Sequence, residues 1–359
     1  MIFTSGSTGT PKGVMLTHGN IVNNSDGINK CAKLRKSDVM VGILPFFHSF
    51  GYTVTLWSVM LNNIAGCYHF SPLDAKQVGK LVSKFKATIL LATPTFLRSY
   101  SRRCTPEQFA SLNLIVAGAE RLPTELCDVY EKKFGVRPVE GYGATELSPL
   151  VSVNVPKSRR DDQWQIDLKE GTVGRPIPNV AAKITDLDSG EELGVDQSGM
   201  LWIKGPNVML GYLNKPELTA EVIKDGWYKT GDVALIDSDG FIKITGRMSR
   251  FSKIGGEMVP HVQVEEILMR LIGDDDDVPN IAVTSVADAK KGERLVVLHT
   301  EIPKPPSELR DGLKEAGLPN IYVPSEDSFV RIEELPVLGS GKLDLKGLKT
   351  IAEEHFPAK

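Results

Sequence analysis

Residues 17 to 140 alternate between short apolar runs and longer runs of helical period, and this alternation limits the fold more than any other feature of the sequence. The apolar runs predict buried strands at Val39–Leu44, Thr88–Ala92 and Leu112–Ala117. The runs of helical period predict helices over Asp74–Lys84, Thr95–Arg103 and Pro123–Phe134. Strands that alternate with helices pack as βαβ units around a mostly parallel sheet, so we expect an α/β fold.

Two other sequence patterns follow residue 140. The chain has 359 residues, a length that suits two or three domains. From about Gly171, short strands are separated by Gly, Pro and Asn, which predicts a β-rich subdomain. After Arg247, the pattern predicts a helix, two strands and a second helix, at Val262–Leu271, Ile281–Val286, Leu295–Thr300 and Ser307–Ala316. We therefore divide the chain into part of a large α/β domain (1–170), a β-rich subdomain (171–248) and a small α+β domain (249–359).

Composition excludes several classes of protein. The net charge of −3 argues against a nucleic-acid surface. The four cysteines show no C-x-x-C spacing, which predicts free or buried thiols in a reducing compartment, and the histidines form no H-x-x-x-H pair for zinc. The apolar stretch Tyr52–Cys67 is interrupted by Asn62 and Asn63, so we expect a core helix there rather than a membrane span. The run Asp274–Asp277 predicts a solvated loop.

The segment "IFTSGSTGTPKGV" (residues 2–14) is rich in glycine and hydroxyl groups and contains one lysine. It is not a Walker loop, because Pro11 stands where the second glycine is needed and Gly13 where the metal-binding hydroxyl is needed. Strand-forming residues follow it, and Thr17 is a good helix N-cap. We expect a loop between two strands that wraps an anion with backbone N–H groups, hydroxyls and Lys12. The alternative is a flexible linker.

Four further segments carry chemistry in a fixed order. "EGYGATELSP" (140–149) contains Thr145 and Glu146, and "YKTGDVALIDSDGFIKITGR" (228–247) contains Asp232 and Arg247. "SKIGGEMVP" (252–260) contains two adjacent glycines, and "LPVLGSGKLDL" (335–345) places Lys342 after Gly-Ser-Gly. With the first loop, these segments resemble the adenylate-forming superfamily of acyl-CoA synthetases, luciferases and peptide-synthetase adenylation domains. The resemblance covers essentially the whole chain. It implies the adenylate-forming enzyme fold, in which the small C-terminal domain is mobile.

The resemblance implies a reaction and a role for each motif. A carboxylate and ATP give an acyl-adenylate and pyrophosphate, and a phosphopantetheine thiol then takes the acyl group. The loop would hold pyrophosphate through Thr4, Ser5, Gly6, Ser7, Thr8, Gly9 and Lys12. Mg²⁺ would bind Glu146, next to Thr145, and Lys342 would supply a mobile cation.

The remaining roles that the resemblance implies concern the nucleotide, the carboxylate and the thiol. Asp232 would accept from the ribose hydroxyls, with Arg247 as its neighbour. The adenine would lie between two segments, Gly118-Ala119-Glu120 and Tyr142-Gly143. His48 would lie beside the carboxylate. The thiol would enter past the loop that carries Lys253, Gly255 and Gly256.

Each residue also has an ordinary structural interpretation when it is considered alone. Asp232 could be a turn residue, since Asp is common in turns. Lys342 could be a solvated surface lysine. His48 and Tyr142 could be packed in a core. The joint pattern favours function for Asp232, Arg247, Glu146 and Lys342.

The C-terminal motifs "GGEMVPHVQVEE" and "ELPVLGSGKLDLKGLK" are most similar to the acyl-acyl carrier protein synthetase branch. Three departures from the common family pattern fit that branch: Ser249, Arg250 at the hinge position, and His261-Val262-Gln263. The resemblance implies a fatty acid substrate, an acyl carrier protein partner, and an acyltransferase or transporter domain upstream in the native chain.

The resemblance also implies that a stretch before the phosphate loop is missing, so that the chain is an N-terminally truncated ligase. We expect a cytoplasmic location, or membrane association through that missing region. The alternatives are a long-chain acyl-CoA ligase and a non-catalytic module that binds AMP or carrier protein.

Overall fold

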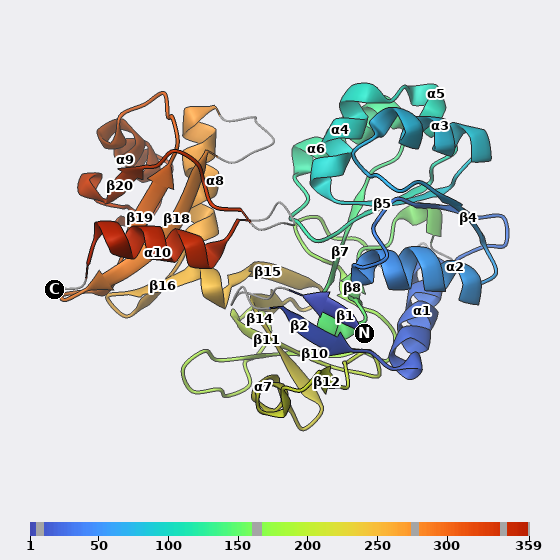
Figure 1. The fold of residues 1–359 in the computed structure, drawn as a ribbon, viewed down its shortest axis with the longest axis horizontal. Helices are drawn as coiled ribbons and strands as arrows, with labels where there is room; N and C mark the ends of the chain where they lie inside the picture. Colours follow the sequence, from blue (N-terminus) through green and yellow to red (C-terminus); the bar gives the residue numbers. More distant parts are fainter. Residues whose placement is uncertain (5–10, 160–166, 274–279, 338–342, 358–359) are drawn as a thin grey trace. The chain divides into compact units, whose positions relative to one another are not determined.

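The computed structural model describes residues 1–4, 11–159, 167–273, 280–337 and 343–357. Its contacts divide the chain into two compact units. The first comprises Met1–Thr4 and Pro11–Thr245, and the second comprises the described residues from Gly246 onward. Figure 1 shows the elements of each unit, coloured along the sequence. None of the described helices is both long and apolar enough to cross a bilayer.

The first unit is built on a seven-stranded sheet. Its strands, in spatial order, are β4 (Ala65–Tyr68), β3 (Val39–Gly42), β5 (Ile89–Ala92), β6 (Leu114–Ala117), β7 (Val139–Gly143), β8 (Leu150–Val153) and β9 (Arg175–Pro176). The strands from β4 to β7 pair in parallel, whereas β8 and β9 are antiparallel to their neighbours. The three strands predicted from apolar runs are confirmed as β3, β5 and β6.

Helices cover both faces of this sheet, which is why its central strands are apolar throughout. Their bounds are α1 (His18–Ala32), η1 (Phe50–Trp57, a π-helix), α2 (Ser58–Leu61), α3 (Ala75–Phe85), α4 (Pro94–Arg103), α5 (Pro106–Phe109) and α6 (Thr124–Phe134). Successive residues of β5 point to opposite faces, so Leu90 joins the core under α3 to α6 and Leu91 joins the core under α1, η1 and α2.

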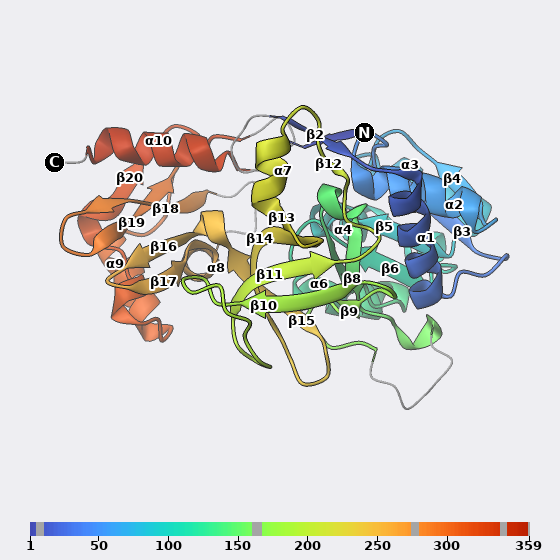
Figure 2. The same ribbon diagram turned by 90° about the horizontal axis from the view of Figure 1, so that it is seen from below.

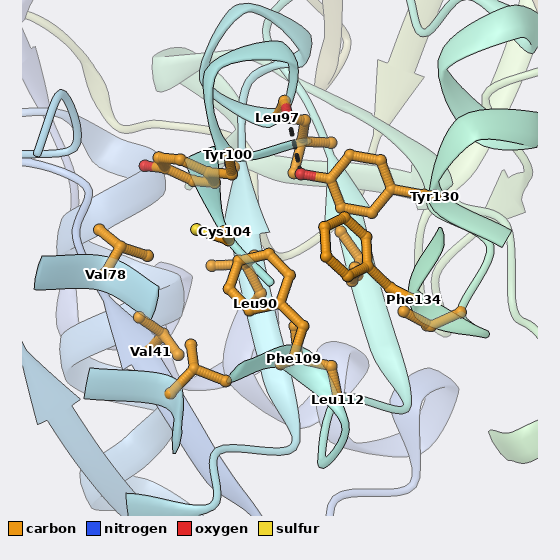
Figure 3. Close-up of a cluster of buried hydrophobic side chains, with 14 of the residues drawn as sticks. Val41, Val78, Leu90, Leu97, Tyr100, Cys104, Phe109, Leu112, Tyr130 and Phe134 are labelled. Atoms are coloured by element: carbon orange, nitrogen blue, oxygen red, sulfur yellow. Dashed lines mark hydrogen bonds between the residues drawn. The ribbon is translucent and has the colours of Figure 1, made fainter. Parts of the chain in front are cut away.

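The core under α3 to α6 is rich in aromatic side chains, which Figure 3 shows gathered around Leu90. The Tyr130 hydroxyl donates a 2.8 Å hydrogen bond to the carbonyl of Leu97, the dashed line in that view. Tyr100 donates to the carbonyl of Pro72 at 2.5 Å. Both buried hydroxyls are thus satisfied, and the rings can be buried without an unpaired polar group.

The prediction of one core helix over Tyr52–Cys67 is wrong beyond residue 61. The helix ends at Leu61, Asn63 takes a left-handed φ of 51°, and Ala65–Tyr68 forms the edge strand β4. Asn tolerates the left-handed conformation better than other residues with a side chain, and this ends the helix. The apolar residues after it then pair with β3.

Two smaller sheets complete the first unit (Figure 2). One joins β1 (Ile2–Thr4), β2 (Lys12–Met15) and β12 (Gly211–Tyr212). The other joins β10 (Ala181–Thr185), β11 (Gly199–Lys204), β13 (Ile223–Lys224), β14 (Trp227–Ile236) and β15 (Ile242–Arg247). The helix α7 (Pro216–Val222) precedes β13, and two short 3₁₀ turns are η2 (Thr145–Leu147) and η3 (Lys157–Arg159).

The start of the chain folds as its sequence predicts. The strands β1 and β2 pair antiparallel, with Thr4 opposite Lys12, so the glycine-rich segment joins two strands. Thr17 is the N-cap of α1, where its side chain accepts from the backbone N–H of Asn20 and forms a capping box.

The second unit is an α+β fold with a five-stranded sheet. Its strands are β16 (Phe251–Ile254), β17 (Glu257–Pro260), β18 (Ile281–Asp288), β19 (Gly292–His299) and β20 (Phe329–Arg331). Its helices and turns are α8 (His261–Ile272), α9 (Pro306–Glu315), α10 (Leu345–His355), η4 (Met248–Arg250), η5 (Asn320–Tyr322) and η6 (Glu326–Ser328). The helices and strands predicted here from sequence are confirmed as α8, β18, β19 and α9. The predicted loop at Asp274–Asp277 lies outside the described residues.

The cysteines are free, as expected from their spacing. Burial raises the pKa of Cys31, Cys67, Cys104 and Cys127 to about 11. These thiols therefore stay protonated and are poor nucleophiles near neutral pH.

Candidate active site

Most candidate residues of the first unit lie on segments that leave the carboxyl ends of parallel strands. His48 follows β3, Gly118-Ala119-Glu120 follows β6, and Thr145 and Glu146 follow β7. Because β3, β5, β6 and β7 are successive parallel neighbours in the sheet, these segments all start at the same edge, the one formed by the carboxyl ends of the strands. Open α/β sheets bind their ligands at that edge.

Glu146 is fixed from two directions. Its side-chain oxygen Oε1 accepts a 2.8 Å hydrogen bond from the hydroxyl of Tyr212, and its carbonyl accepts one of 2.8 Å from the backbone N–H of Met209. Burial and the neighbouring Glu146 carboxylate raise the pKa of Tyr212 well above its ordinary value, so Tyr212 remains a donor. Among the described residues, none donates to the other oxygen, Oε2.

Lys12 reaches the same tyrosine. Its ammonium group lies 5.2 Å from the centre of the Tyr212 ring, within the range of a cation–π contact. The strand β12, which carries Tyr212, pairs with β2, which carries Lys12. The ring thus brings a cation from the first predicted motif next to the carboxylate of the second. The loop residues Ser5, Gly6, Ser7, Thr8 and Gly9 lie outside the described residues.

Asp232 and Tyr142 form a direct pair. The Tyr142 hydroxyl donates to Oδ2 of Asp232 at 2.5 Å, and the backbone N–H of Asp232 donates to Oγ1 of Thr230 at 3.0 Å. Asp232 is only 3% exposed. Asp232 is therefore not a solvated turn residue, whereas Tyr142 is partly buried against a hydrophobic core as its ordinary interpretation expects.

The segments predicted to flank the adenine contain Gly118 and Gly143, and both have close neighbours. A Cβ on Gly143 would lie 2.1 Å from the carbonyl oxygen of Pro149, so this position requires glycine. A Cβ on Gly118 would lie 3.1 Å from the Phe50 ring. Next to Gly118, Ala119 takes a left-handed φ of 69°. Gly143 and Gly118 thus lie close to other parts of the protein, the Pro149 carbonyl and the Phe50 ring.

Two other candidates make local contacts. The Glu120 carboxylate accepts from the hydroxyl (2.8 Å) and the backbone N–H (3.2 Å) of Thr95, at the start of α4. This anion at a helix N-terminus is positioned by the fold. His48 is exposed, and its Nδ1 accepts from the backbone N–H of Phe50 at 3.3 Å. Ser49, the next residue, lies 3.2 Å from the Thr145 hydroxyl, which ties the His48 segment to the turn of Glu146.

The remaining candidates belong to the second unit. Gly255 and Gly256 form the turn between β16 and β17 with φ values of 59° and 90°, and Arg247 ends β15. The backbone N–H of Lys253 donates to Glu293 Oε2 at 2.7 Å. Lys342 lies outside the described residues.

Arg250, at the hinge position inferred from sequence, is buried and forms an ion pair with Glu265 of α8. The backbone N–H of Val283 also donates to Glu265, at 2.6 Å. Arg250 is therefore attached to the core of the second unit.

Sequence reasoning missed Tyr212 and Glu140. Tyr212 is 66 positions from its partner Glu146, and no local motif links them. Burial raises the pKa of Glu140 on β7 to about 7, and its Oε1 accepts from the backbone N–H of Leu122 at 3.4 Å. The available sequence signal for Glu140 was a lone carboxylate between Val139 and Gly141, two positions before Tyr142.

The fold defines an α/β protein whose C-terminal residues form a small α+β unit. The family model of AMP-binding enzymes matches residues 1–213, and the chain belongs to this family. The predicted superfamily is thus confirmed.

Curated relatives are ligases that act on carboxylic acids, according to their names. The chain is 32% identical over 352 residues to a long-chain-fatty-acid–CoA ligase of Bacillus subtilis (strain 168), covering 95% of this chain and 59% of the relative. It is 35% identical over 300 residues to the probable 4-coumarate–CoA ligase 3 of Dictyostelium discoideum, covering 81% and 51%. The chain therefore spans between half and three-fifths of the length of these relatives.

Solved structures confirm the predicted fold class. ATP-bound MatB from Rhodopseudomonas palustris matches with a TM-score of 0.83 at 26% identity, covering 98% of this chain and 68% of that one. The o-succinylbenzoate CoA synthetase MenE from Bacillus subtilis, in complex with ATP and a magnesium ion, matches with a TM-score of 0.82 at 26% identity, covering 97% and 69%. Both are similar over nearly the whole of this chain.

Proposed function

We propose that this chain carries the adenylating machinery of an AMP-forming acid–thiol ligase whose acid is a fatty acid. The observation that carries the proposal is the junction of Lys12, Tyr212 and Glu146, which brings together two sequence motifs more than a hundred residues apart. An ammonium group and a carboxylate with one oxygen still available suit a polyphosphate and its counter-ion.

Different residues would bind the ribose, the adenine and the phosphates of ATP. Asp232, held by Tyr142, would accept the ribose hydroxyls, and the segments that follow β6 and β7 would flank the adenine. Lys12 would neutralise charge on the phosphates. The donor set fits Mg²⁺, because this ion commonly binds one or two carboxylates while phosphates and water supply its other ligands. When bound, Mg²⁺ would reduce the charge repulsion between the phosphates and the incoming carboxylate.

The reaction has two steps. An oxygen of the fatty acid carboxylate bonds to the α-phosphorus of ATP, and the bond from that phosphorus to the bridging oxygen breaks and releases pyrophosphate. The sulfur of a pantetheine thiolate then bonds to the acyl carbonyl carbon, and AMP leaves with the electrons of the broken bond. Lys342 is our candidate for neutralising charge in the first step, on the basis of its motif alone.

We further propose that the thiol belongs to acyl carrier protein. The C-terminal motifs, with Arg250 and His261-Val262-Gln263, support this choice. The alternative is a long-chain acyl-CoA ligase, and the Bacillus subtilis relative, which carries that name, favours it.

The test uses this chain with ATP, Mg²⁺ and a fatty acid. Release of pyrophosphate, followed by thioester formation on carrier protein, would support the whole proposal. Thioester formation on free CoA alone would establish the alternative acceptor. AMP binding without pyrophosphate release would instead indicate a non-catalytic binding module.

A further inference from the structure

Two buried asparagine side chains hold the turn that follows Glu146 in the chain. Asn24 lies on α1 and Asn207 lies in the loop after β11, and they are 0% and 1% exposed. Both donate hydrogen bonds to the same two backbone carbonyls, those of Leu147 and Leu150. Leu147 ends the η2 turn that contains Glu146, and Leu150 begins β8. The two side chains thus converge on one turn from distant parts of the sequence.

The contacts of the two asparagines with this turn are numerous. The side-chain amide of Asn24 donates to the Leu150 carbonyl at 2.7 Å and to the Leu147 carbonyl at 3.4 Å, and its oxygen accepts from the Leu150 backbone N–H at 3.3 Å. The amide of Asn207 donates to the same two carbonyls, at 3.3 and 3.1 Å respectively. The Ser148 hydroxyl, between the two leucines, donates to the Asn207 carbonyl at 2.8 Å. We call Asn24 and Asn207 the asparagine clamp.

The bonds of the asparagine clamp fix directions more than they add stability. Burying an amide side chain costs free energy, and its hydrogen bonds mostly offset that cost. Within the described residues, no donor reaches the buried Oδ1 atom of Asn207, which is a further cost. Each hydrogen bond nevertheless constrains the direction of its carbonyl, and a buried network of such bonds makes the segment that it joins rigid. The clamp is therefore suited to orienting the turn.

A third asparagine supports the other backbone contact of Glu146. Asn20 precedes Asn24 by four residues on α1, so both side chains lie on one face of the helix. Its amide donates at 2.7 and 2.8 Å to the two carbonyls on either side of Asn207. A little further along, the backbone N–H of Met209 donates to the carbonyl of Glu146 at 2.8 Å. One face of α1 thus holds both segments that fix the backbone at Glu146.

We propose that Asn24 and Asn207 are positioning residues for Glu146, because their shared bonds to one turn hold its carboxylate in the direction in which it would bind Mg²⁺. The inference rests on the proposed function, since that function supplies the metal and the ATP. The clamp contacts the backbone after Glu146 rather than the ligand. Its loss should let the carboxylate take other directions, which weakens the metal site and leaves the ribose contact of Asp232 unchanged.

The test compares two single variants, Asn207→Ala and Asn154→Ala. Asn207→Ala removes one half of the clamp, while Asn24 still donates to both carbonyls, so the fold should persist. Asn154 is the matched control: it is a 3% exposed asparagine of the same unit, and its amide donates to the carbonyl of Thr172 at 2.7 Å, outside this turn. Isothermal calorimetry measures ATP binding at a series of Mg²⁺ concentrations, and AMP binding without Mg²⁺.

For Asn207→Ala, we expect the Mg²⁺ concentration at half-maximal ATP binding to rise about tenfold, as is typical when the support of a metal ligand is lost. AMP affinity should stay the same. Saturating Mg²⁺ should restore the rate of pyrophosphate release, because the carboxylate itself is still present. Asn24→Ala should act in the same direction and more strongly, since Asn24 makes three bonds to the turn and Asn207 makes two. If Asn24→Ala does not fold, Asn207→Ala decides alone.

The control variant Asn154→Ala should change neither the Mg²⁺ requirement nor the AMP affinity, even where it lowers stability. Equal Mg²⁺ requirements in Asn207→Ala and the unaltered protein would overturn the inference. So would a parallel loss of Mg²⁺ and AMP affinity in Asn207→Ala, since that pattern indicates a general loosening of the fold.

The calorimetric comparison needs no turnover, so it separates this inference from the proposed function. If the unaltered chain binds ATP in a Mg²⁺-dependent way but releases no pyrophosphate, the proposed reaction fails and the asparagine clamp is still tested by Asn207→Ala. If ATP binding to the unaltered chain does not depend on Mg²⁺, the inference is overturned as well.

Discussion

The Tyr142 hydroxyl donates a 2.5 Å hydrogen bond to Asp232, although the two residues are 90 positions apart in the chain. The pair joins β7 of the seven-stranded sheet to β14 of the five-stranded sheet. It holds one buried carboxylate in a fixed direction at the proposed ribose position, so its removal should affect nucleotide binding more than stability.

Asp232→Ala should weaken the binding of AMP and ATP alike, because two ribose hydroxyls would lose their acceptor. The expected loss is about 1–3 kcal/mol in binding free energy, measured by isothermal calorimetry. Tyr142→Phe is the matched comparison, since it leaves the carboxylate in place and removes only its donor. We expect Tyr142→Phe to cost less. Unchanged AMP affinity in Asp232→Ala would mean that Asp232 serves the fold alone.

Glu146→Gln should raise the Mg²⁺ concentration needed for half-maximal pyrophosphate release. Tyr212→Phe should act in the same direction, by about 10- to 100-fold in metal affinity or rate, because it removes the donor that orients the carboxylate. The readout is a Mg²⁺ titration at saturating ATP. Tyr322→Phe, a tyrosine of the second unit, is the control. Equal Mg²⁺ titrations for all variants would exclude Glu146 as the ligand.

Gly143→Ala should destabilise the first unit, since its Cβ would lie 2.1 Å from a carbonyl oxygen that cannot move alone. The expected cost is about 1–3 kcal/mol of unfolding free energy, typical of overpacking. All four tryptophans precede residue 246, so their fluorescence during urea unfolding reports this unit. Gly141→Ala is the control, because its Cβ would make only ordinary contacts, from 3.4 Å. A Gly143→Ala protein as stable as Gly141→Ala would contradict the prediction.

The sequence predicted helices and strands correctly where neighbouring residues alone determine them. Leu90 lies in a strand buried on both faces, so its neighbours are all apolar, and Thr17 carries its own capping signal. The prediction of one helix over Tyr52–Cys67 was wrong in part, because an edge strand and a core helix can both be apolar. Only the left-handed Asn63 and the pairing with β3 separate the two outcomes.

The candidate residues were proposed one by one from sequence motifs, and their roles stay predictions, whereas their contacts were not predicted. Motif order identified Glu146 and Lys12, whereas Tyr212, which contacts both, depends on how β12 pairs with β2. The buried pair of Arg250 and Glu265 was missed for the same reason, since it joins a 3₁₀ turn to a helix. Contacts between side chains far apart in sequence depend on packing, which no local pattern contains.

Arg250→Met should destabilise the second unit by about 3–5 kcal/mol, because it leaves the buried Glu265 carboxylate without its cation. The double variant Arg250→Met/Glu265→Met should be more stable than the sum of the single variants predicts, since neither buried charge remains. Hydrogen exchange of the β19 amides measures the opening of this unit. Additive effects would show that the two side chains act independently.

The second unit should lose stability on mild acidification because of His261. Its ring lies at the start of α8, with Nε2 2.6 Å from the Ser252 hydroxyl. Burial, together with the positive charges of Arg250 and Lys349, lowers its pKa to about 3. In the unfolded chain the pKa is about 6.5. Between these values the unfolded state binds a proton that the folded state does not, so stability falls as the pH falls.

Below pH 6.5, His261 should make the free energy of unfolding fall by up to about 1.4 kcal/mol per pH unit. Well above pH 6.5, the ring is neutral in both states and contributes no pH dependence. His261→Gln removes this titration while it keeps a polar group next to Ser252. Hydrogen exchange of the β18 and β19 amides at pH 7, 6 and 5 should therefore show a steeper loss of stability in the unaltered protein than in His261→Gln. Other groups titrate equally in both proteins and cancel in the difference. Parallel pH profiles would mean that His261 accepts its proton in the folded state and that its burial does not control the acid stability of this unit.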